Sequence, residues 1–245
     1  MDFNPGVVLA PLTGVFWGPA GAWGCAVGSL MSDSFFGMWS DLSYYRAAGL
    51  FLFALSSKRL WDSFPDWFRG GIDHAPVWNA ALRFSIIAMP GCFIAASWSA
   101  LGSQLLRLYP FSYYLTLQLA VNLISILLLG AALYRLGVSE IVAHLGTWKD
   151  VMNPKKIYRP VSLIGVGLLV IGSFGVCIAG LSYSGFHYGH WPARTAYVLG
   201  TISEPKIMNV ILPFFVLQLL GLFWPGRPVE RKNSSYEQPS LDLGV

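Results

Sequence analysis

The stretch that decides the fold is FNPGVVLAPLTGVFWGPAGAWGCAVGSLMS, residues 3–32, which carries no charged side chain. This run is too long and too apolar for a helix of a soluble protein, but Gly18 and Pro19 divide it. Proline removes an amide donor and clashes with the preceding helical turn, and glycine permits a tight reversal. We therefore predict two short membrane helices joined as a hairpin at Gly18-Pro19, with small residues after the turn that let another helix approach closely.

The rest of the chain also has the composition of a membrane protein. Of the 245 residues, 55% are hydrophobic and 11% are charged, whereas soluble domains carry about 25% charged residues. Four further uncharged runs, residues 84–106, 108–134, 160–186 and 207–226, are each long enough to cross a hydrocarbon core, which takes about 20 residues. A weaker segment, residues 44–57, contains Arg46 and is counted because it must return the chain after the hairpin. The prediction is an all-α polytopic membrane bundle of about six or seven helices.

The distribution of basic residues orients the predicted bundle. Most of the 16 Lys and Arg residues fall in residues 58–76, residues 135–160 and the tail from residue 227. The positive-inside rule therefore places these segments, including the C-terminus, in the cytoplasm of a multi-pass protein of the cell (inner) membrane. A hairpin would leave the N-terminus outside, whereas a single broken span would leave it inside.

Catalytic and metal-binding chemistry is sparse in the sequence. The four histidines are His74, His144, His187 and His190. None of them has a carboxylate or cysteine partner at metal-ligand spacing. The sequence therefore predicts no metal, no cofactor and no enzymatic activity. No nucleic-acid partner is expected, because the basic residues lie beside membrane helices rather than in a basic domain.

Polar groups in or beside the predicted membrane helices mark a candidate binding site. Charge inside a membrane is costly and normally faces a cavity or a partner. Arg46 has Asp33 and Asp41 close in sequence, so it belongs either to a structural ion pair or to the mouth of a cavity. Asn122 needs a hydrogen-bond partner across a helix interface, or it faces a ligand.

The segment LAPLTGVFWGPAGAWGCAVGSLMSD, residues 9–33, followed by SYYRAAGLFLFALSSKRLW, residues 43–61, resembles the membrane core of a known family. The family is the substrate-binding S components of energy-coupling factor vitamin transporters. The positions that fit its Gly-Pro segment are Gly14, Phe16, Gly18, Pro19, Gly21, Gly28 and Asp33. The resemblance covers roughly residues 6–134, where LQLAVNLISILLLGAALYRL, residues 117–136, is similar to the last helix of that core.

The chain departs from this family at both ends of the core. The helix that usually precedes the Gly-Pro segment is absent, and the two helices near residues 161–184 and 207–224 are additional. We therefore expect a membrane core in residues 1–134, a cytoplasmic loop in 135–160, two additional membrane helices in 161–226 and a disordered tail in 227–245.

The resemblance implies an uptake protein in contact with membrane lipid that captures a small vitamin-like or base-like molecule from outside, while partner subunits hydrolyse ATP. The residues implied in substrate binding are Ser29, Asp33, Trp39, Tyr44, Tyr45, Arg46 and, deeper, Asn122. The aromatic members suit stacking on a planar ligand, but Trp and Tyr are also enriched in ordinary interfacial belts. A second class of function stays open. In that class the protein is an accessory or structural subunit of a larger membrane complex, or a membrane sensor module.

Overall fold

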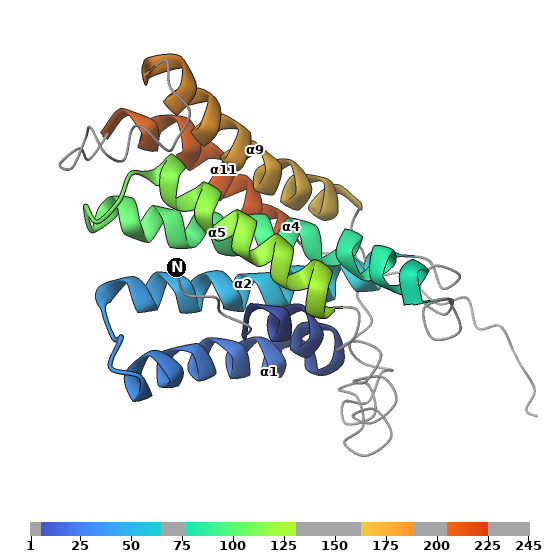
Figure 1. The fold of residues 1–245 in the computed structure, drawn as a ribbon. Helices are drawn as coiled ribbons and strands as arrows, with labels where there is room; N and C mark the ends of the chain where they lie inside the picture. Colours follow the sequence, from blue (N-terminus) through green and yellow to red (C-terminus); the bar gives the residue numbers. More distant parts are fainter. Residues whose placement is uncertain (1–5, 65–76, 131–162, 189–204, 225–245) are drawn as a thin grey trace, which may run out of the picture.

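The computed structural model describes residues 6–64, 77–130, 163–188 and 205–224, and all its regular elements in these ranges are helices. They are α1 (Gly6–Phe35), α2 (Asp41–Ser63), α4 (Val77–Leu105), α5 (Phe111–Ser125) continued by the π-helical turn η1 (Ile126–Gly130), α9 (Leu163–Tyr188) and α11 (Pro205–Phe223). Figure 1 shows α1 on one side of the bundle and α9 with α11 on the other. The all-α prediction is confirmed for the described residues.

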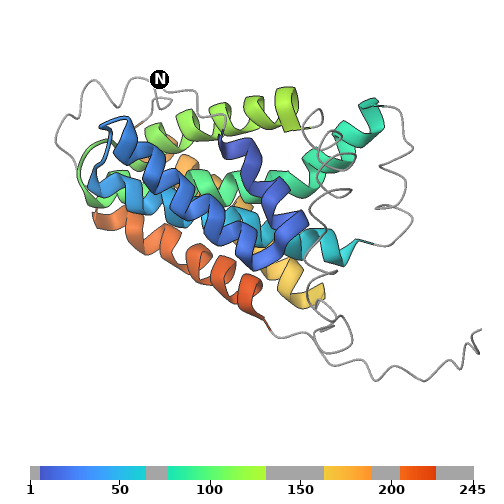
Figure 2. The ribbon, with the colours of Figure 1, turned by 90° about the horizontal axis from the view of Figure 1, so that it is seen from below.

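The first element, α1, is a hairpin rather than a straight helix. Gly18 leaves the helical conformation, with φ 58° and ψ −132°, values that glycine adopts without a steric penalty. The Thr13 hydroxyl lies 2.9 Å from the Cys25 thiol. In a straight helix these residues would be roughly 18 Å apart along the axis. The arms, residues 6–17 and 19–35, therefore pack against each other, and the predicted reversal at Gly18-Pro19 is confirmed (Figures 1 and 2).

The second helix, α2, extends beyond the predicted segment of residues 44–57 at both ends. At its start, the Ser40 amide donates to the Ser43 hydroxyl at 3.2 Å, which satisfies a backbone group before the first turn. Near its end, the Lys58 ammonium lies 2.5 Å from the Asp62 carboxylate, one helical turn away. Polar groups at the two ends thus lengthen a helix whose apolar run alone is short.

The central helix is α4, because it contributes to each of the three hydrophobic clusters of the bundle. Phe84 and Cys92 pack with α1 and α2, whereas Ala96 and Ala100 pack with α5, α9 and α11. Ile94 joins the cluster that links α2 to α9 and α11. The additional C-terminal helices therefore share the core of the bundle through α4.

Three helices in the described residues are long and apolar enough to cross a membrane. These segments are Leu82–Leu105, Phe111–Gly130 and Leu163–Tyr183, and Ile207–Phe223 is a shorter apolar helix. The larger count of six or seven membrane helices stays a prediction. The predicted loop 135–160, the predicted tail 227–245, and His74, His144 and His190 lie outside the described residues.

Candidate functional site

A cavity of about 570 Å³ lies along the α1 hairpin and against α2. This volume falls within the range of about 300–1,000 Å³ that is typical of small-molecule sites. Its lining residues are Leu9, Thr13, Trp17, Ala20, Gly21, Gly24, Cys25, Gly28, Ser29, Ser32, Asp33 and Leu50. Nearly all of them come from the two arms of α1, so the reversal at Gly18 creates the cavity.

The register of the hairpin gives the cavity two chemically different ends. Thr13 lies opposite Cys25, and a Cβ atom at Gly21 would overlap the Thr13 carbonyl. Because the arms run antiparallel from the turn at Gly18, Trp17 lies at the turn end and Asp33 at the far end. Ser29, Ser32 and Asp33 make the far end polar, whereas small and apolar residues line the rest.

Asp33 is the charged residue of this lining, and it is almost completely buried, with 4% of its surface exposed. It pairs with Arg46 of α2, whose Nη1 atom lies 3.7 Å from Oδ2. That separation permits ion pairing but is too long for a hydrogen bond. The buried Oδ2 atom has no hydrogen-bond partner among the described residues. A buried hydrogen-bond acceptor without a donor is costly. A ligand in the cavity that donates a hydrogen bond to this oxygen would remove that cost.

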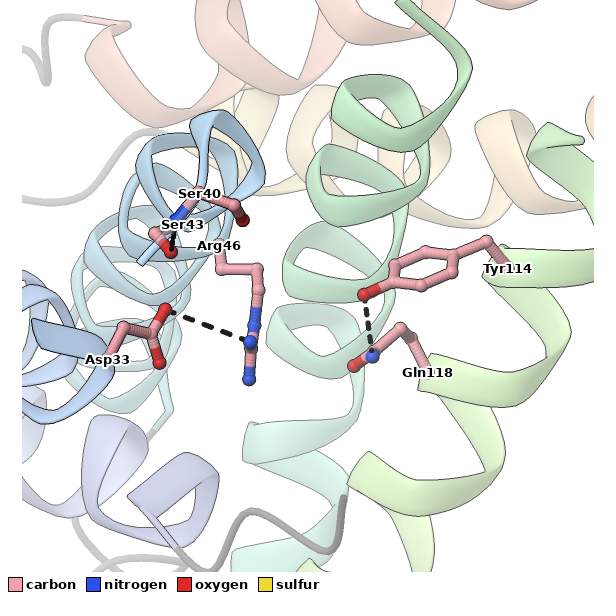
Figure 3. Close-up of polar contacts among 6 residues, drawn as sticks. All are labelled: Asp33, Ser40, Ser43, Arg46, Tyr114 and Gln118. Atoms are coloured by element: carbon pink, nitrogen blue, oxygen red, sulfur yellow. Dashed lines mark hydrogen bonds and ion pairs between the residues drawn. The ribbon is translucent and has the colours of Figure 1, made fainter. Parts of the chain in front are cut away.

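Arg46 lies beside the cavity on α2 and pairs with Asp33. Figure 3 shows its guanidinium between the Asp33 carboxylate on one side and Tyr114 and Gln118 on the other. The Gln118 side-chain amide donates to the Tyr114 hydroxyl at 3.2 Å. The ion pair with Asp33 therefore joins α1 to α2, and the Arg46 side chain is 22% exposed.

The aromatic residues predicted for the site do not line this cavity. Trp39 and Tyr44 are exposed and form an edge-to-face pair, with ring centroids 5.4 Å apart. Tyr45 packs against α4, where a Cβ atom at Gly102 would overlap its ring. Of the predicted residues, Ser29 and Asp33 line the cavity and Arg46 pairs with Asp33.

Asn122 is buried on α5, outside the cavity lining, and its side-chain oxygen has no hydrogen-bond partner among the described residues. It follows Gln118 by one helical turn and Tyr114 by two, so the three side chains share a face of α5. Asn122 therefore continues the polar face that Tyr114 and Gln118 form on α5, one turn further along the helix.

Sequence reasoning missed Thr13, Trp17 and Cys25, which line the cavity. The turn itself could have indicated them. A reversal at Gly18 brings residues before the turn opposite residues after it, in pairs that lie progressively farther from the turn. Tyr114 and Gln118 were also missed, and their signal was the four-residue spacing that they share with Asn122.

Neither a metal cluster nor a known relative identifies the site. The described residues contain no group of three or more His, Cys, Asp or Glu side chains that could hold a metal ion. Comparisons of the chain with protein-family models, with curated proteins and with solved structures found no match. The function is therefore argued from the cavity and its polar end.

Proposed function

We propose that the chain is an integral membrane protein that binds a small organic molecule in the α1 cavity, for uptake from outside. Three helices of sufficient length and apolar character support insertion in the membrane. The resemblance of the Gly-Pro segment to transporter S components supports uptake of a vitamin-like or base-like molecule. In this proposal the chain performs no bond chemistry, and partner subunits supply ATP hydrolysis.

The observation that carries the proposal is the buried Asp33 carboxylate at the polar end of the cavity. A purely structural ion pair would be expected to bring the carboxylate within hydrogen-bonding distance of Arg46. Instead the separation is 3.7 Å, and Oδ2 has no hydrogen-bond donor among the described residues. A ligand with a donor group would satisfy this oxygen and would place its remaining atoms along the cavity.

One observation favours the second candidate, an accessory subunit of a larger membrane complex. Ala20, Gly24 and Gly28 are exposed at four-residue spacing on the second arm of α1. A Cβ atom at Gly24 or Gly28 would meet no neighbouring atom within 4 Å. Small residues at this spacing let the helix of a partner protein approach closely in a membrane.

A ligand screen on the purified protein in lipid nanodiscs tests the proposal. Vitamins and nucleobases are added singly, and the unfolding temperature is measured for the wild type, Asp33→Asn and Asp41→Asn. Asp41 is the matched control, because it is an exposed aspartate in the first turn of α2 and does not line the cavity. We expect one compound to stabilise the wild type and Asp41→Asn, and to bind Asp33→Asn at least tenfold more weakly.

The same preparation separates the two candidates. A ligand-binding protein responds to the compound when it is purified alone. The proposal is overturned if no compound of any class changes the unfolding temperature while another membrane protein co-purifies at fixed stoichiometry. The accessory-subunit reading then predicts that Gly24→Leu, which adds bulk to the exposed stripe, releases that partner.

A further inference from the structure

We infer that the ligand of the α1 cavity is an elongated amphiphile, with an uncharged hydrogen-bond-donor head at Asp33 and an apolar tail directed toward Trp17. This inference rests on the proposed function, because it assumes that a small molecule binds in the α1 cavity. Within the proposed ligand class it favours fat-soluble, vitamin-like compounds with an uncharged donor head over base-like ones. It follows from four properties of the cavity, which are its length, the chemistry of its middle, the charge at its polar end and the surface around its opening.

The cavity is elongated. Its lining on the second arm of α1 runs along one helical face from Gly21 to Asp33, which spans roughly 18 Å at 1.5 Å per residue. An extended chain can follow this whole length, whereas a compact ring system would occupy only part of it.

The middle of the cavity offers apolar contact rather than hydrogen bonds. The Thr13 hydroxyl donates to the Ala10 carbonyl at 3.1 Å and also contacts the Cys25 thiol, so both side chains have partners within the hairpin. Leu9 and Leu50 supply apolar surface from the first arm and from α2. A polar group of a ligand placed here would lose its hydration without replacement, whereas a hydrocarbon tail would not.

The polar end selects an uncharged head. The Asp33 carboxylate and the Arg46 guanidinium already balance each other in charge. An anionic head would face the carboxylate directly, and a cationic head would leave one excess positive charge in a poorly hydrated site. A hydroxyl or amide head avoids both costs and donates to Oδ2, which accepts no hydrogen bond from the described residues, with Ser29 and Ser32 lining the space beside it.

The exposed part of the cavity lining is bordered by apolar surface on the second arm of α1. Its rim includes Gly24 and Gly28, both exposed. The neighbouring side chains of the same arm are large, apolar and exposed, with 62% of Trp23, 48% of Val27 and 55% of Met31 accessible. In the proposed membrane setting, such a rim faces hydrocarbon, so a molecule dissolved in the bilayer enters sideways.

The test uses four probes that share one tail and differ in the head, which are oleyl alcohol, methyl oleate, oleate and oleylamine. Each is added to the full-length protein in nanodiscs, and the rate of maleimide labelling at Cys25 is measured. Cys25 lines the cavity, whereas Cys92 and Cys177 are buried in the helix bundle, and Cys25→Ser identifies its signal. We expect oleyl alcohol to protect Cys25 at a tenfold lower mole fraction than each of the other three.

Two variants assign this selectivity to the cavity. Asp33→Asn is expected to abolish the tenfold preference for oleyl alcohol, and Asp41→Asn is expected to keep it. Gly28→Leu, at a position where a Cβ atom meets open space, is expected to block the tail and to remove the preference without lowering the unfolding temperature. It keeps the inference testable if Asp33→Asn does not fold.

The remaining outcomes separate this inference from the proposed function. Equal protection by all four probes would mean that the groove takes up any bilayer chain, and it would overturn head recognition at Asp33. Asp33-dependent stabilisation by a water-soluble vitamin or nucleobase, without protection by oleyl alcohol, would overturn the amphiphile but keep the proposed function. A protein that responds to neither class would refute both.

Discussion

The Thr13 hydroxyl lies 2.9 Å from the Cys25 thiol, although these residues are twelve positions apart in the sequence. This contact joins the two arms of α1 across the reversal at Gly18 and sets their register. The register in turn decides which side chains line the cavity and places Asp33 at the end furthest from the turn. The candidate site therefore depends on the close approach of the two arms.

Gly21→Ala should destabilise the protein, because the added Cβ atom would overlap the Thr13 carbonyl in the opposite arm. Overpacking of this kind costs about 1–3 kcal/mol, so we expect a clear fall in the unfolding temperature of the purified protein. Gly24→Ala is the matched control, because its Cβ atom would meet open space. Equal unfolding temperatures for the two variants would contradict the register of the hairpin.

The reversal could be predicted from the sequence because its cause is local. Gly18 supplies a positive φ, and Pro19 cannot donate to the preceding turn, so two adjacent residues determine the geometry. The long apolar runs were predictable for a related reason, since their length alone indicates a helix that can cross a membrane. The ends of α2 could not be predicted in this way, because they depend on single polar contacts such as that of Lys58 with Asp62.

Only part of the candidate site could be predicted, because most of it depends on contacts between helices that are distant in sequence. Asp33 and Arg46 stand out as charges in an apolar chain, and one of the two readings of the sequence paired them. Nothing local indicates that Tyr114 and Gln118 lie toward Arg46, since this depends on how α5 packs. The exposed positions of Trp39 and Tyr44 likewise follow from the turn between α1 and α2.

Arg59→Gln should loosen the attachment of α11 to α2. The Arg59 guanidinium donates to the Leu222 carbonyl at 2.5 Å and to the Trp224 carbonyl at 2.7 Å, which satisfies backbone groups at the end of α11. Loss of charge-assisted hydrogen bonds of this kind costs about 1.5–3 kcal/mol. We expect a lower unfolding temperature and faster proteolytic cleavage after α11.

The control for this variant is Arg107→Gln, which removes the same charge from an exposed position in the turn between α4 and α5. A second variant, Gly165→Ala, should reproduce the effect, because its Cβ atom would overlap the Arg59 guanidinium. If all three proteins unfold alike, Arg59 does not hold α11 in place.

The distribution of Lys and Arg predicts that the C-terminus faces the cytoplasm. A variant with its native cysteines replaced and Ser240→Cys added to the tail should react with a membrane-impermeant maleimide only after the cells are opened. An equivalent Ser34→Cys variant, close to the α1–α2 turn, should react in intact cells. Efficient labelling of the tail in intact cells would reverse the predicted orientation.

A double-mutant cycle of Asp33→Asn and Arg46→Gln separates a structural ion pair from a binding group. Because 3.7 Å is too long for a charge-assisted hydrogen bond, we expect a coupling free energy below about 1 kcal/mol in thermal or denaturant unfolding. Binding of the ligand found in the screen should fall at least tenfold in Asp33→Asn and in the double variant, since both lack the carboxylate. The opposite pattern, a large coupling energy with normal binding in both variants, would make the two charges a structural pair and favour the accessory subunit.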